Sequence, residues 1–176
     1  MKPAARAARL HVCALARIAE TVEETGARSL VTLLNHGTPV TRPAAIRPDR
    51  HLFIAMSDIV DAMDGHILPA ERHVREFLAF VEAWDRSEPL LIHCFAGVSR
   101  STAAAFIAAC ALSPDRAENE IALAIRAASP TATPNARLVA VADTLLGRAG
   151  RMRQAIEAIG RGETCDTGTP FGLEVG

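Results

Sequence analysis

Apolar residues in the first half of the chain form short runs of strand length, separated by turn residues or by segments with helical periodicity. Four runs predict buried strands: Leu10–Leu15, Ser29–Leu34, His51–Met56 and Leu90–Cys94. Between the first two runs, Ile18–Thr25 has a helical pattern and stops at Gly26, a residue type favoured just beyond helix C-termini. Because strands alternate with helices here, the sequence predicts an α/β domain with a small, mainly parallel, four-stranded sheet flanked by helices.

Helical periodicity dominates the rest of the chain. Pro69 suits the first position of a helix whose apolar residues continue to Trp84. Four further helices are predicted: Arg100–Leu112, Ser113 to about Ala128, Pro134 or Asn135 to Leu146, and Arg151–Ile159. We therefore expect residues 1–160 to form a single domain. The Gly-rich, polar residues 161–176 are expected to be a flexible C-terminal tail.

Composition limits the classes of partner. The net charge is −1, with no tyrosine and one tryptophan, so neither a basic field nor an aromatic platform favours nucleic-acid binding. No apolar run is long enough to cross a bilayer, and none of signal-peptide length follows the basic residues 1–10. We expect a cytoplasmic protein that binds neither nucleic acid nor membranes; its oligomeric state is left open.

The four cysteines, Cys13, Cys94, Cys110 and Cys165, lie far apart and form no CxxC pair. This spacing disfavours a zinc site or a disulfide framework, so no metal and no cofactor are expected. Cys13 and Cys110 lie in apolar runs and are predicted to be small core residues. Only Cys94 has neighbours that indicate chemistry.

The sequence HCFAGVSRS, residues 93–101, follows the fourth apolar run and precedes a helix. A loop in this position can turn its backbone N–H groups inward, and the N-terminus of the helix adds positive potential, which together make an anion site. Gly97 suits a tight loop position, and Arg100 in the first helical turn can offer two parallel N–H donors to a phosphate. The predicted phosphate-binding residues are Phe95, Ala96, Gly97, Val98, Ser99 and Arg100. The same environment favours the thiolate form of Cys94.

The pattern His-Cys-x5-Arg-Ser resembles the signature of the cysteine-dependent protein tyrosine phosphatases, and its Ala-Gly and Ser-Arg-Ser elements look most like the dual-specificity branch. The resemblance implies a metal-independent phosphomonoester hydrolase that forms a cysteinyl-phosphate intermediate. It makes Cys94 the nucleophile, Arg100 the clamp on phosphate and transition state, and Ser101 an aid to breakdown of the intermediate. His93 would be a buried residue that tunes the loop and the thiol.

The family also uses an aspartate, on a loop that follows an upstream strand, to protonate the leaving group. Asp58 immediately follows the third apolar run and is the first choice, Asp61 the second, and Asp64 lies on the same loop. Chain geometry alone does not separate Asp58 from Asp61. Asn135 ends a Pro-rich turn and matches a residue that braces the phosphate loop in the family; an ordinary helix-start residue is the equal alternative.

The interior of the predicted loop has no Lys or Arg before Arg100, which favours a singly phosphorylated substrate, either a phosphorylated protein or a small phosphomonoester. Three arginines on the long loop 35–50 could touch an anion, but solvation is the better expectation for them: Arg42, Arg47 and Arg50. Two alternatives remain at this stage. One is a pseudophosphatase that binds phosphate without turnover, and the other is a rhodanese-like sulfur transferase.

Overall fold

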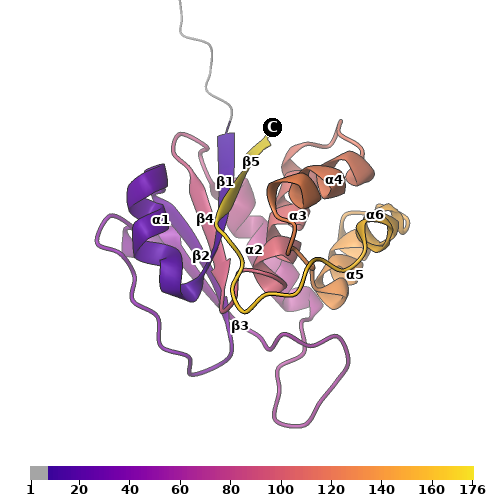
Figure 1. Cartoon of the computed structure of the whole chain (residues 1–176), viewed down its shortest axis with the longest axis horizontal. Coiled ribbons are helices and arrows are strands. Elements are labelled where there is room, and N and C mark those ends of the chain that lie inside the picture. The colour runs from indigo at the N-terminus through magenta and orange to yellow at the C-terminus, as the bar shows by residue number, and fades with distance from the viewer. Residues whose placement is uncertain (1–7) are drawn as a thin grey trace, which may run out of the picture.

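A mixed five-stranded sheet forms the centre of the protein, for which a computed structural model describes residues 8–176 (Figure 1). Its strands are β1 (Ala8–Ala14), β2 (Ser29–Leu34), β3 (His51–Ala55), β4 (Leu90–Cys94) and β5 (Phe171–Val175). The order across the sheet is β3-β2-β4-β1-β5. The first four strands run parallel, as the sequence predicts, and β5 pairs antiparallel with β1.

The prediction of a four-stranded sheet is wrong, because the sheet has a fifth strand, β5. The prediction that residues 161–176 form a flexible tail is wrong as well, since β5 lies within this segment. Phe171, Leu173 and Val175 point to the buried side of β5, and Gly172 and Glu174 alternate with them. This alternation is typical of an edge strand with one buried face. Only three apolar residues carry the pattern, and Gly and Thr precede it, so the sequence pattern alone predicts a tail.

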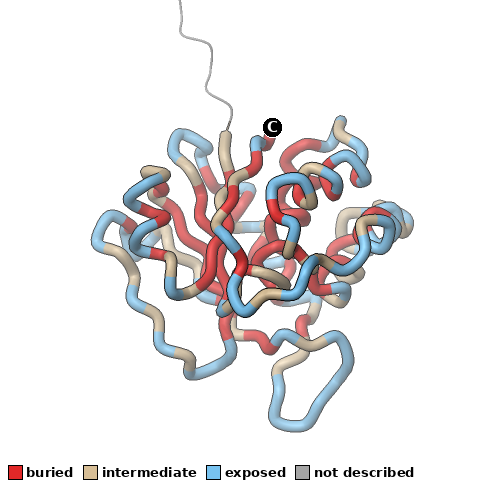
Figure 2. The backbone as a smooth tube through the Cα atoms, viewed as in Figure 1, coloured by how far each residue is buried: buried red, intermediate tan, exposed pale blue. Residues whose placement is uncertain are grey.

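Helices cover both faces of the sheet, with α1 (Ile18–Thr25) on one face and the remaining α-helices on the other (Figures 1 and 2). These are α2 (Glu71–Ala83), α3 (Arg100–Leu112), α4 (Glu118–Ala128), α5 (Ala136–Leu145) and α6 (Arg151–Ile159), with short 3-10 turns at Leu15–Arg17 and Pro48–Arg50. The predicted start of α4 is wrong, because residues 113–117 form a turn before Glu118. Within residues 8–176, no helix is both long and apolar enough to cross a membrane.

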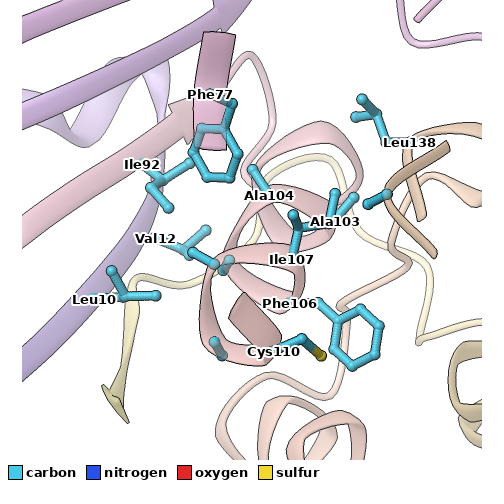
Figure 3. Packing of buried hydrophobic residues seen from close by; sticks show 14 of the residues in the cluster. Leu10, Val12, Phe77, Ile92, Ala103, Ala104, Phe106, Ile107, Cys110 and Leu138 are labelled. Carbon is cyan, nitrogen blue, oxygen red and sulfur yellow. The ribbon is translucent and has the colours of Figure 1, made fainter. Parts of the chain in front are cut away.

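The core is built around α3, which is buried on all sides because its sequence is almost wholly apolar. Figure 3 shows Ala103, Ala104 and Ile107 of this helix packed near Val12 and Ile92 of the sheet. Small alanine side chains let the helix approach the strands closely. This packing fixes the N-terminus of α3 directly beyond the carboxyl end of β4. The predicted phosphate-binding loop, residues 95–99, lies between them.

Candidate active site

Residues 95–99 connect β4 to α3, and four of their five backbone carbonyls bond to groups outside the loop. Four carbonyl oxygens accept backbone N–H groups, in the pairs Phe95–Leu15 at 3.1 Å, Ala96–Gly168 at 2.8 Å, Val98–Thr133 at 2.9 Å and Ser99–Asn135 at 3.1 Å. In a planar trans peptide the N–H points opposite to the C=O. The N–H groups that follow these carbonyls are therefore directed toward the inside of the loop, as an anion site requires.

Gly97 allows the loop to lie against the end of β1. Its φ is +70°, a left-handed conformation that favours glycine. A Cβ atom there would lie 2.8 Å from the backbone N of Ala14 and 2.8 Å from the backbone C of Cys13. Glycine is thus required at this tight position for two reasons: the backbone conformation favours it, and a side chain would clash with β1.

Cys94 ends β4 below this loop and is 2 % exposed. Its Sγ lies 3.1 Å from the Ser101 Oγ in the first turn of α3. A hydroxyl at this distance can donate a hydrogen bond to a thiolate. At Cys13 and Cys110, burial raises the pKa of the thiol to about 12, which keeps both protonated near pH 7.

Arg100 is a buried cation that pairs with no carboxylate among residues 8–176. Its Nη1 donates to Asn35 Oδ1 at 2.7 Å and to the Met56 carbonyl at 2.8 Å. Its buried Nε has no partner in the described part of the chain. Because an uncompensated buried charge is costly, this arrangement calls for an anion at the Nε side of the guanidinium.

His93 lies under the loop, is fully buried, and is held by a chain of polar side chains. Its Nε2 lies 2.7 Å from Thr32 Oγ1, and the same oxygen lies 2.7 Å from His51 Nε2. Burial lowers the pKa of His93 to about 4, so the imidazole is neutral near pH 7. A neutral, anchored ring agrees with a tuning role and not with that of a proton carrier.

Asp58 contacts both the loop and the start of α5. Its Oδ1 accepts from Ser99 Oγ at 2.7 Å and from Asn135 Nδ2 at 2.9 Å. The Asn135 Oδ1 accepts the Leu138 N–H at 3.0 Å, so this residue caps α5. Its Nδ2 also donates to the Ile59 carbonyl at 3.2 Å, and its backbone N–H donates to the Ser99 carbonyl. The helix-start role of Asn135 is therefore present in the structure, whereas a direct brace on the phosphate loop by its side chain stays a prediction.

A cleft of about 430 Å³ opens over the loop and is lined by Asn35, Asp58, Phe95 and Arg100, among others. Asp61 lines a neighbouring groove of about 540 Å³ but not this cleft. The loop arginines engage their surroundings, because Arg42 bonds the Ile46 carbonyl, Arg47 pairs with Asp49, and Arg50 pairs with Asp85. The geometry thus favours Asp58 over Asp61. The three arginines bond protein groups and are not simply solvated, and none of them lines the cleft.

Sequence reasoning missed Asn35 and Thr32, which hold Arg100 and His93. Both are polar residues on or just beyond β2, whose six residues are all buried. A polar residue at the carboxyl end of a buried parallel strand is a signal that could have found Asn35. Within residues 8–176, no group of three or more His, Cys, Asp or Glu side chains lies together in a way that could hold a metal ion.

Comparison with solved structures identifies the fold. The chain is similar to DUSP15 (20 % identity, covering 85 % of this chain and 90 % of that one, TM-score 0.61). It is also similar to the Yvh1 phosphatase domain of Chaetomium thermophilum (20 % identity, 81 % and 93 % covered, TM-score 0.60). A third match is the human tyrosine phosphatase-like serine/threonine/tyrosine-interacting protein (14 % identity, 80 % and 92 % covered, TM-score 0.61).

The fold of the protein is therefore similar to that of these phosphatases and of the phosphatase-like protein. No protein-family model matches the sequence. No curated protein matches it either. At these identities the likeness is one of fold, and a fold alone does not determine an activity.

Proposed function

We propose that the protein is a metal-independent phosphomonoester hydrolase of the tyrosine or dual-specificity kind. The observation that carries this proposal is the buried guanidinium of Arg100, unpaired with any carboxylate among residues 8–176, next to a loop whose carbonyls bond outward and so direct the following N–H groups inward. Such a site binds a tetrahedral oxyanion through backbone N–H groups and the parallel N–H donors of a planar guanidinium. A sulfur atom at its base is the nucleophile that this arrangement supports best.

In the proposed reaction the Cys94 thiolate attacks phosphorus while the bond from phosphorus to the leaving oxygen breaks. Asp58 gives its proton to that oxygen, and a cysteinyl phosphate remains. A water then attacks phosphorus, its proton returns to Asp58, and the phosphorus–sulfur bond breaks. The Ser101 hydroxyl, 3.1 Å from the sulfur, stabilises the departing thiolate. Arg100 and the loop amides hold the equatorial oxygens throughout.

The surroundings of the cleft support a singly phosphorylated substrate, because no Lys or Arg lies within the loop before Arg100. Residues 95–99 are called the catalytic loop from here on, and its Phe95 is an exposed apolar side chain. The loop that carries Asp58 has two more, Val60 and Met63. They offer contact area to a phosphorylated protein segment, although a small phosphomonoester fits the same phosphate site. The cytoplasmic location stays a prediction of the sequence.

The two alternatives differ in how the structure bears on them. One structural neighbour is named a phosphatase-like interacting protein, so the fold is compatible with a pseudophosphatase. Here Cys94, Arg100 and Ser101 are all present, and the Cys94 Sγ lies 3.1 Å from the Ser101 Oγ, which favours turnover. The matched structures are phosphatases or phosphatase-like, which disfavours a rhodanese-like sulfur transferase.

Hydrolysis of p-nitrophenyl phosphate in the presence of EDTA tests the proposed function. We expect turnover that is unaffected by the chelator and inhibited by orthovanadate, because Arg100 and the loop amides provide the electrostatic stabilisation without a metal. Vanadate binding without turnover of this substrate or of phosphopeptides would support the pseudophosphatase instead. Transfer of sulfur from thiosulfate to cyanide, with no phosphatase activity, would support the sulfur transferase.

Replacing Asp58 with asparagine is expected to lower kcat for a phosphotyrosine peptide by about 10²-fold, since a general acid contributes rate of that order. The effect should be smaller for p-nitrophenyl phosphate, whose leaving group needs less protonation. The asparagine keeps an oxygen that can accept from Ser99 and Asn135, so KM should change little. Steady-state kinetics with both substrates measures this pattern.

The matched control is Asp61→Asn, on the same loop but outside the cleft. Its kcat should stay within a few-fold of the parent for both substrates, because a single acid dominates proton transfer. If Asp61→Asn shows the larger loss and the leaving-group dependence, Asp61 is the acid and the assignment of Asp58 is wrong.

A further inference from the structure

Residues 160–170, which we call the C-terminal strap, run from the end of α6 to the start of β5 (Figure 1). The strap has no regular secondary structure, yet both of its ends are fixed. The Gly160 carbonyl accepts from Arg126 Nη2 at 2.8 Å, and Phe171, immediately beyond the strap, is buried. Between these anchors the strap passes along the outside of the catalytic loop.

One hydrogen bond joins the strap directly to the catalytic loop. The Gly168 N–H donates to the Ala96 carbonyl at 2.8 Å. The planar peptide that follows this carbonyl carries the N–H of Gly97 in the opposite direction, toward the anion site. The orientation of that donor is therefore tied to the position of Gly168.

A second path runs through the connector 129–135 between α4 and α5. The Gly162 N–H donates to Thr133 Oγ1 at 3.0 Å, and the Glu163 N–H donates to the Pro130 carbonyl at 3.0 Å. The backbone N–H of Thr133 in turn donates to the Val98 carbonyl at 2.9 Å. The strap thus supports the connector on one side, and the connector supports the catalytic loop on the other.

The contact at Gly168 leaves no room for a side chain. A Cβ atom on Gly168 would lie 2.8 Å from the Gly97 carbonyl oxygen and 3.4 Å from Val98 Cγ2. Real Cβ atoms essentially never lie so close to backbone oxygens, so a larger residue has to displace either the strap or the catalytic loop. Glycine is therefore required here for close approach to the site, a role that its sequence position in the supposed tail does not indicate.

We propose that the C-terminal strap holds the catalytic loop in its anion-binding conformation, with Gly168 as a positioning residue for the Ala96–Gly97 peptide. Gly168 acts through the loop and does not touch the substrate. The effect of Gly168 on catalysis rests on the proposed phosphatase function. Its effect on the loop can also be measured through anion binding and the reactivity of Cys94, and neither measurement requires turnover.

The test compares the full-length parent with Gly168→Ala. We expect kcat/KM for p-nitrophenyl phosphate to fall by about 10- to 100-fold, because a displacement of about 1 Å in a reacting site has effects of this size. The pH midpoint for alkylation of Cys94 by iodoacetamide, followed by mass spectrometry of its peptide, should rise by about one pH unit as the inward N–H groups turn away. Orthovanadate binding should weaken by a similar factor to kcat/KM.

Gly172→Ala is the matched control, since it lies in β5, where an added Cβ meets only the side chains of Arg9 and His11. It should keep the parent's alkylation midpoint and kcat/KM within a few-fold, whatever its effect on thermal stability. A second variant, Thr133→Val, removes the acceptor for Gly162 without adding bulk. It should shift the midpoint and vanadate affinity in the same direction as Gly168→Ala, which keeps the proposal testable if that variant does not fold.

The proposal is overturned if folded Gly168→Ala, or Thr133→Val in its place, keeps the parent's alkylation midpoint and vanadate affinity. It is also overturned if activity falls only in proportion to the unfolded fraction, because the strap would then be a purely structural element. If the parent hydrolyses no phosphomonoester but the midpoint and vanadate affinity still shift, the strap proposal stands and the proposed function fails.

Discussion

Replacing Cys94 with serine is expected to abolish phosphomonoester hydrolysis, with a loss of about 10⁴-fold or more in kcat. The thiol of Cys94 is the proposed nucleophile at the base of the loop, and a serine hydroxyl in its place stays protonated near pH 7. The donors that grip the anion remain, since none of them belongs to the Cys94 side chain. Assays of p-nitrophenyl phosphate turnover, with orthovanadate binding measured by a thermal shift, should therefore show lost activity and retained anion binding.

Cys110→Ala is the matched control for this experiment. It removes a thiol that is also buried but lies in the middle of the core, where its pKa is raised to about 12. The variant should keep its kcat within a few-fold and lose only some stability. Substantial activity in Cys94→Ser would exclude Cys94 as nucleophile and leave the loop as an anion-binding element.

Arg100→Lys is expected to lower kcat/KM by about 10³-fold, although the charge is kept. An ammonium group is a point charge, whereas the guanidinium binds Asn35 and Met56 through Nη1 and still has its unpartnered Nε to offer an anion. The three donors of a lysine share one nitrogen, so they cannot bind Asn35 and Met56 on one side and an anion on the other, as the separate nitrogens of a guanidinium can. The inhibition constant for orthovanadate should rise together with the loss of rate, because the same donors bind ground state and transition state.

Arg75→Lys provides the control for this change on an exposed face of α2, where Arg75 pairs with Glu71. It should leave both kcat/KM and the inhibition constant unchanged within error. If Arg100→Lys behaves in the same way, Arg100 does not contact the phosphate, and the buried guanidinium has only a structural role.

The parallel part of the sheet could be predicted because each of its strands is a short apolar run bounded by turn residues or a helical pattern. β1 to β4 lie within a residue or two of the predicted runs, and α3 has the predicted bounds. β5 could not be predicted with the same ease. It is a short edge strand whose apolar residues alternate with Gly172 and Glu174, and its stability comes from pairing with β1.

The core of the candidate site could be predicted because its chemistry is contained in consecutive residues. A cysteine, a glycine and an arginine within one strand–loop–helix connection already define an anion site. The residues that support it come from distant parts of the chain. Asn35 holds Arg100 and Gly168 holds Ala96, and these contacts depend on the packing of β2 and the strap, which no local pattern encodes.

The choice between Asp58 and Asp61 illustrates the same limit. Both aspartates fit the spacing from the cysteine, and sequence alone left them unresolved. The tertiary structure favours Asp58, because Asp58 contacts Ser99 and Asn135 and lines both the cleft at Arg100 and the neighbouring groove, whereas Asp61 lines only the groove. A loop residue's role depends on which surface its side chain reaches, and that is fixed by the fold as a whole.

The most direct test of the central claim is to trap the reaction and look for phosphate on sulfur. The protein is mixed with p-nitrophenyl phosphate, quenched within milliseconds, digested under conditions that preserve thiophosphate, and analysed by mass spectrometry. We expect one phosphoryl group on the peptide that contains Cys94, increased in Ser101→Ala, where breakdown slows, and absent from Cys94→Ser. Turnover with no phosphoryl group on Cys94, or with the group on another residue, would contradict the account.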